Sequence, residues 1–232
     1  MSFAIEGQSM PKRSHPLFPL LALILSAPAL ANAQQTARNN PGIFEASTDI
    51  GATRPGATLY DPATASYRVT GGGADLWGAA DQFHFTWLKL SGDATLSAGI
   101  HFAPGTGDPT AKAILIFRQS LDPASPYADA AIHADGHITL QYRATPGGKT
   151  EDTTSSRHGS ARLGIVRSGD QFTLIAGAEK AHLEPDPAPA TVVLHDPVYV
   201  GIGVCAHNAG HLETATFSNV KLDRPSPAKP AR

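Results

Sequence analysis

The stretch Thr70–Phe102, "TGGGADLWGAADQFHFTWLKLSGDATLSAGIHF", decides the fold of this chain. After the glycines Gly71–Gly73, aromatic and polar side chains alternate over residues 81–90, which is the two-residue period of a β-strand. The Ser-Gly-Asp sequence at 91–93 supplies a glycine where a tight reversal needs one, and a second apolar segment follows. The stretch therefore predicts an antiparallel hairpin, preceded by a glycine-rich bend in which the backbone turns and approaches a neighbour closely.

Short strand-like segments and turn residues continue along the chain, and no segment shows a sustained helical period. Turns are predicted at "DG" (135–136), "PGGK" (146–149) and "SGD" (168–170). The predicted strands cover residues 57–60, 66–71, 81–90, 94–102, 112–119, 127–134, 137–144, 161–168, 171–178, 197–206 and 214–222. Many short strands with tight reversals and no crossover helices predict an all-β fold, a two-sheet antiparallel jelly-roll sandwich.

The alternation also predicts which side chains are buried. In the segment 81–90, Phe83, Phe85 and Trp87 share one face, while His84 and Thr86 lie on the other. We interpret the aromatic face as the core of the sandwich and expect the opposite face to be exposed.

The N-terminal residues 1–33 have the features of a secretory signal peptide. Lys12 and Arg13 precede an apolar run over 17–25, and small residues follow up to Ala33. The apolar run is too short to span a bilayer, so we expect a periplasmic or secreted protein with no membrane span after signal removal.

The remaining chain suits one domain. We expect a polar linker over residues 34–42, the sandwich over 43–222 and a disordered, proline-rich tail over 223–232.

The composition argues against several partners and cofactors. The chain has 18 basic and 20 acidic residues, a net charge of −2 and no basic cluster, so we expect no nucleic-acid partner. Cys205 is the one cysteine, so an intramolecular disulfide is impossible, and its apolar neighbours predict a small buried side chain. His133 and His137 flank the turn at 135–136, but nothing nearby completes a zinc site. We expect neither a metal nor a cofactor.

Four blocks of the chain, in this order, resemble one family: "DIGATRPGATLYDPATASYRVTGGGADLWGAADQFHF" (49–85), "KLSGDATLSAGIHF" (89–102), "KAILIFRQSLDPASPYADAAIHADGHITLQYR" (112–143), and "PVYVGIGVCAHN" (197–208) with "ATFSNVKL" (215–222). They are similar to the concanavalin A-like lectin/glucanase-type β-sandwich domain of exported bacterial proteins, of the kind associated with TolB-like periplasmic proteins. Lectins, glycan-binding modules and glucanases share this fold, so the resemblance implies a sugar ligand on the concave face of one curved sheet.

Polar side chains that point outward from the middle strands form the candidate ligand site. Planar guanidinium, carboxylate and amide groups suit bidentate recognition of sugar hydroxyls, and an aromatic ring offers a stacking surface. The candidates are His84, Arg118, Asp129, His133, Gln141 and Arg143, with Trp77 or Tyr127 as the ring. The alternative is that these groups make ordinary cross-strand pairs on a solvated face.

These features favour a non-catalytic module that binds a glycan or a cell-envelope component. We assign no catalytic residues, because the sequence contains neither a Glu-x-Asp-x-x-Glu strand nor a Gly-x-Ser-x-Gly elbow. One alternative is a carbohydrate-active enzyme, a hydrolase or lyase of modified sugars such as 3-keto-glycosides, with His84, Arg118 and His133 converging in a deep pocket. Another is a TolB-associated domain that binds an envelope protein through a sheet edge.

Overall fold

The computed structural model describes residues 41–225, apart from 106, 160–161 and 179–180. The predicted signal peptide lies outside the described residues, as do most of the predicted linker and tail. Strands, turns and irregular segments make up the described chain, and none of its segments is a helix long and apolar enough to cross a bilayer.

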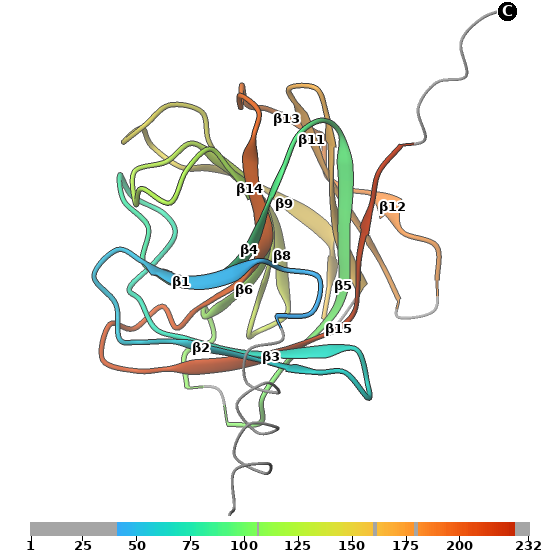
Figure 1. Ribbon diagram of the computed structural model, residues 1–232. Helices are drawn as coiled ribbons and strands as arrows, with labels where there is room; N and C mark the ends of the chain where they lie inside the picture. Colours follow the sequence, from blue (N-terminus) through green and yellow to red (C-terminus); the bar gives the residue numbers. More distant parts are fainter. Residues whose placement is uncertain (1–40, 106, 160–161, 179–180, 226–232) are drawn as a thin grey trace, which may run out of the picture. The chain divides into compact units, whose positions relative to one another are not determined.

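The described chain forms two antiparallel sheets (Figure 1), which confirms the predicted all-β sandwich. The seven-stranded sheet has the order β1 (Ala46–Ile50), β4 (Phe83–Leu90), β14 (Val198–Cys205), β6 (Lys112–Arg118), β7 (Tyr127–His133), β8 (His137–Arg143) and β9 (Glu151–His158). The eight-stranded sheet has the order β12 (Glu184–Pro185), β11 (Gln171–Gly177), β10 (Arg162–Ser168), β5 (Ala94–Phe102), β15 (Glu213–Asp223), β3 (Ser66–Gly71) and β2 (Ala57–Asp61), with β13 (Ala190–Thr191) also paired to β11.

All eleven predicted strands are present, with ends that shift by at most two residues. The prediction missed β1 and β9, which form the two edges of the seven-stranded sheet, and the two-residue strands β12 and β13. β9 has the sequence EDTTSSRH and is largely exposed, so it carries no apolar alternation from which a strand could be predicted.

The main core lies between the two sheets and contains the inward side chains of both. From the seven-stranded sheet it takes the even-numbered Leu88 and Leu90 of β4, together with Leu115 and Phe117 of β6. The prediction that Phe83, Phe85 and Trp87 belong to this core is therefore wrong, because the alternation along β4 places them on the opposite face of the sheet.

We call that opposite face of the seven-stranded sheet the outer face. Phe83 and Phe85 are nevertheless fully buried there, because a second apolar cluster covers this part of the outer face. Leu76, from the loop between β3 and β4, packs in this cluster against Ile114 and Ile116 of β6. Both faces of the sheet are thus covered in the region of β4 and β6.

The glycine-rich bend leads the chain from β3 into this loop, as predicted. A Cβ atom on Gly71 would collide with the carbonyl oxygen of Val204. Gly73 has a φ of +108°, in the region that favours glycine, and a Cβ there would collide with the carbonyl of Gln82. The glycines therefore allow the loop to lie close against the sheet.

Candidate functional site

The outer face of the seven-stranded sheet divides into an apolar half and a polar half. Strand register places Lys112 of β6 beside His133 of β7, and Asp129 of β7 beside Gln141 of β8, which is itself paired with Asp152 of β9. These side chains share the outer face because cross-strand partners point to the same side of a sheet. The polar half therefore runs over β7, β8 and β9, next to the apolar cluster.

The loop 74–82 lies over the outer face and is held there by polar contacts. Lys112 Nζ donates to Asp75 Oδ1 at 2.6 Å, and Tyr127 Oη donates to the carbonyl of Leu76 at 3.2 Å. Asp81 lies at the other end of this loop and is fully buried. The loop is thus anchored on β6 and β7 and forms a wall beside the polar half.

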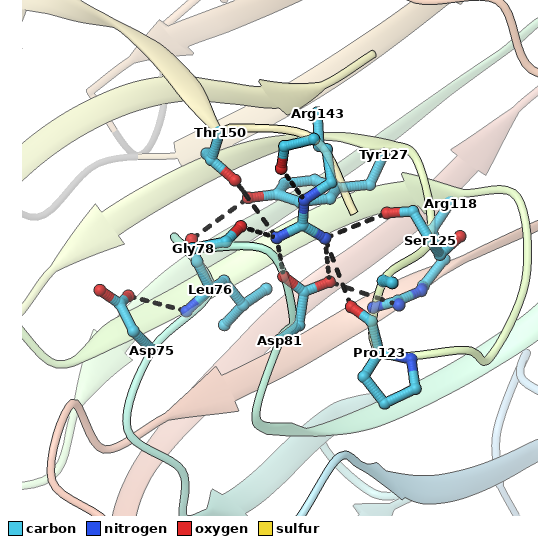
Figure 2. A network of polar contacts seen from close by, with 12 residues as sticks. Asp75, Leu76, Gly78, Asp81, Arg118, Pro123, Ser125, Tyr127, Arg143 and Thr150 are labelled. Atoms are coloured by element: carbon cyan, nitrogen blue, oxygen red, sulfur yellow. Dashed lines mark hydrogen bonds and ion pairs between the residues drawn. The ribbon is translucent and has the colours of Figure 1, made fainter. Parts of the chain in front are cut away.

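Asp81 lies between two buried guanidinium groups (Figure 2). Arg143 donates to both carboxylate oxygens, from Nη1 to Oδ2 at 3.0 Å and from Nη2 to Oδ1 at 2.7 Å, while Arg118 Nη2 lies 3.4 Å from Oδ2. Burial raises the pKa of Asp81, and its contacts with the two arginines oppose that rise. This bidentate geometry gives a strong, directional link between the loop and the sheet.

The two arginines also bind the backbone of other loops. Arg143 donates to the carbonyls of Gly78 and Ser125 at 2.6 and 3.1 Å, and Arg118 donates to those of Ser120 and Asp122, both at 2.6 Å. The expectation that Arg118 and Arg143 lie on a solvated face is wrong, since neither has any exposed surface. We assign both arginines to loop anchoring. Neither side chain has exposed surface with which to contact a ligand.

Tyr127 and Asp129 are likewise inaccessible, contrary to the expectation of an exposed face. The Tyr127 ring lies under the Arg143 guanidinium, 5.0 Å from ring centroid to Cζ, so it offers no free face for stacking. Burial raises the pKa of the Asp129 carboxyl well above its usual range, and neither of its oxygens has a hydrogen-bond partner among the described residues. Burial therefore favours the protonated, neutral form of the Asp129 carboxyl.

His84 faces the space between the two sheets, so its predicted place among the outward-pointing side chains is wrong. Its Nδ1 lies 2.7 Å from Asp49 Oδ1 of β1, and its Nε2 lies 3.2 Å from Thr58 Oγ1 of β2. The His84 side chain is 4% exposed, and the backbone at Gly56 can lie against it because this residue has no Cβ atom. His84 thus joins strands of the two sheets and lies away from the outer face.

A pocket of about 300 Å³ opens on the polar half of the outer face. Three of the predicted site residues, Trp77, His133 and Gln141, line it together. Trp77 is 37% exposed and is the candidate ring that a ligand can reach. The other lining residues, which sequence reasoning did not place in the site, are Asp75, Thr110, Lys112, His137, Thr139, Asp152 and His207.

The charged groups on one side of this pocket are already paired. Asp75 accepts from Lys112 through Oδ1, and its Oδ2 lies 3.3 Å from His207 Nε2. Asp108 Oδ2 lies 3.7 Å from His207 Nδ1. The backbone of His207 has a φ of +55°, which is uncommon for a residue other than glycine. Lys112 Nζ lies 5.5 Å from the centroid of the Trp77 ring. Lys112 thus connects this charged cluster to the Trp77 ring at the pocket wall.

The floor of the pocket contains buried polar atoms without partners. They are His133 Nε2, Thr139 Oγ1 and Gln141 Oε1, none of which has a hydrogen-bond partner among the described residues. Thr139 and Gln141 are each 2% exposed. An unpaired buried polar atom costs about 1–3 kcal/mol, so these three atoms call for partners from outside the described residues, such as water or a ligand.

Comparison with known proteins supports the fold assignment. No protein-family model matches the chain, and no curated protein sequence matches it. Among solved structures, a functionally unknown protein from Saccharomyces cerevisiae is similar over 78% of this chain and 97% of its own length, with a TM-score of 0.58 and 17% identity. A carbohydrate binding module, CBM66 from Bacillus subtilis, is similar over 78% of this chain and 98% of its own, with a TM-score of 0.50 and 15% identity.

A GH43 protein from Bacillus licheniformis is similar over 68% of this chain and 32% of its own length, with a TM-score of 0.50 and 14% identity. Identities this low concern the fold alone. Together with the two antiparallel sheets, these likenesses show that the described domain has the concanavalin A-like sandwich fold.

Proposed function

We propose that the protein is a binding module that holds a glycan in the pocket beside Trp77. The observation that carries this proposal is the exposed Trp77 ring next to the unpaired polar atoms of Thr139 and Gln141. A sugar ring has an apolar face that stacks on an aromatic side chain, and its hydroxyl groups both donate and accept hydrogen bonds. The pocket offers both kinds of contact on one small surface.

The arrangement of the histidines favours binding over catalysis. A catalytic pocket was expected where His84, Arg118 and His133 converge, yet His84 faces the space between the sheets and Arg118 is buried beneath a loop. Only His133 of these three lines the pocket. The same fold in the CBM66 carbohydrate binding module is consistent with this proposal. We also propose that the protein is exported, as the predicted signal peptide over residues 1–33 indicates.

A glycan array probed with the protein, followed by isothermal titration of any hit, tests the proposal. Trp77→Ala should weaken binding of the hit about twofold to twelvefold, because a stacked aromatic ring contributes about 0.5–1.5 kcal/mol. Leu59→Ala is the matched control, since Leu59 is also exposed but lies on β2 in the other sheet. Undiminished binding by a folded Trp77→Ala variant would place the glycan elsewhere, and no hit on a broad array would remove the proposal.

A further inference from the structure

The hydrogen-bonding groups of the pocket determine which class of sugar fits it. We propose that the pocket selects glycans that carry a protonated amine, such as glucosamine oligosaccharides, and rejects glycans that carry carboxylates. The inference rests on the proposed function, because it concerns the ligand of that same pocket. It follows from the acceptors His133 Nε2 and Gln141 Oε1, from the unpaired carboxylate of Asp152, and from the absence of an unpaired lysine or arginine among the described residues that line the pocket.

His133 presents an acceptor to the pocket. Burial lowers the pKa of His133 to about 4, so the ring is neutral at physiological pH. The backbone of Thr110 acts to raise this pKa, as a carbonyl that accepts from a ring N–H does. Since Nε2 is the nitrogen without a partner, Nδ1 carries that proton and Nε2 is left with its lone pair.

Gln141 and Asp152 continue this row of acceptors across the neighbouring strands. The unpaired amide atom of Gln141 is the carbonyl oxygen Oε1, which can only accept. Asp152 is the cross-strand partner of Gln141, lines the pocket and is exposed. No described lysine or arginine forms an ion pair with Asp152, so its carboxylate is available to a ligand.

The basic side chains Lys112 and His207 of the pocket are already engaged by other groups of the protein. Lys112 is the one lysine or arginine among the described residues that line the pocket, and it is 3% exposed. Two of its three donors already go to Asp75 Oδ1 and to the carbonyl of Leu76. His207 lies between the carboxylates of Asp75 and Asp108. A sugar carboxylate would therefore meet Asp152 without a free positive charge to offset the repulsion.

The ammonium group of an amino sugar satisfies these constraints. It supplies three donors and one positive charge, so it can pair with Asp152 and still donate to a neighbouring acceptor such as Gln141 Oε1. The hydroxyl groups of the same sugar can donate to His133 Nε2, and its ring can stack on Trp77.

The test is isothermal titration of the protein with four trisaccharides of matched length, built from glucosamine, N-acetylglucosamine, glucose and galacturonate. At about pH 6.5 the amine is charged, since amines of this type have a pKa near the ~7.7–8.0 of an α-amino group. The glucosamine trimer should bind at least about threefold more tightly than the glucose and N-acetylglucosamine trimers, and the galacturonate trimer should bind most weakly.

Asp152→Asn should reduce the ratio of the affinities for the glucosamine and glucose trimers to about one, because it removes the charge that distinguishes the two ligands. Asp170→Asn is the matched control, because it removes the same charge from an exposed turn of the other sheet. Equal affinity of the wild type for the amino and neutral trimers, or tightest binding of the galacturonate trimer, would overturn this inference and leave the proposed function standing. If none of the four trimers nor any arrayed glycan binds, the proposed function itself fails.

Discussion

Arg143 on β8 holds Asp81, at the end of the loop that covers the outer face, through two hydrogen bonds between fully buried side chains. This pair determines where the loop 74–82 lies, and the loop carries Trp77 to the edge of the pocket. Arg143 therefore links the stability of the fold to the position of the proposed binding pocket, although its own side chain is fully buried.

Removing the guanidinium of Arg143 should destabilise the fold. Arg143→Ala leaves the Asp81 carboxylate buried without its bidentate partner, and breaking a buried ion pair in this way costs about 3–5 kcal/mol. The free energy of unfolding from urea denaturation measures the effect. Arg157→Ala, on exposed β9, should change it by no more than about 0.5 kcal/mol. Similar stabilities of the two variants would contradict the role of Arg143 as an anchor.

Gly71, at the end of β3, and Gly78, in the covering loop, should respond differently to substitution by alanine. Gly71→Ala forces a Cβ against the carbonyl of Val204 and should destabilise the protein by about 1–3 kcal/mol. At Gly78 a Cβ meets nothing within 4 Å, so Gly78→Ala should be neutral or slightly stabilising. Thermal melts of both variants give the comparison. An unchanged melting temperature for Gly71→Ala would mean that β3 and β14 are not as close as described.

The buried Asp129 should make stability fall as the pH rises. Its pKa is raised in the folded state by burial, so the native protein holds a proton that the unfolded chain releases above its pKa of 3.8. The contribution of Asp129 is therefore fully present below that value and is lost as the pH rises through the raised pKa.

Asp129→Asn removes this titration, so its stability relative to the wild type should increase as the pH rises from about 4 toward the raised pKa of Asp129. Urea denaturation of both proteins at several pH values measures the difference. A difference that does not vary with pH would show that Asp129 is ionised in the folded protein at neutral pH.

His133 should remain neutral well below the pH at which an ordinary histidine titrates. Burial lowers its pKa to about 4, and the proton of the neutral ring should reside on Nδ1. Long-range ¹H–¹⁵N NMR correlations of the imidazole report both the titration midpoint and the tautomer. A midpoint near the usual 6.5, or a proton on Nε2, would remove the acceptor that the pocket is described as presenting.

The sequence predicted the strands better than it predicted their faces. Alternation along β4 correctly groups Phe83 with Phe85 and correctly predicts their burial, but a single strand cannot indicate what covers each of its faces. The uninterrupted apolar run "AILIF" in β6 is the better signal, because a strand that is apolar on both sides is covered on both sides. Reading β6 together with β4 would have suggested that the outer face is partly covered.

The pocket could be predicted only in part, because it depends on strand register and on the path of a loop. Trp77, His133 and Gln141 stand out as an exposed ring and as polar residues of amphipathic strands. Asp152 was missed because β9 has no strand-like pattern, and its proximity to Gln141 follows only from the pairing of β8 with β9. Arg118 and Arg143 differ in no local feature from exposed arginines, and their burial depends on loops distant in sequence.

Fluorescence of a single tryptophan gives the most direct test of the central claim that the pocket beside Trp77 is the binding site. The chain has two tryptophans, so a Trp87→Phe variant retains only the indole of Trp77. Titration of this variant with a glycan hit should give a saturable change in emission, with the same dissociation constant as calorimetry. Calorimetric binding of that glycan to the same variant with no change in Trp77 emission would contradict the claim.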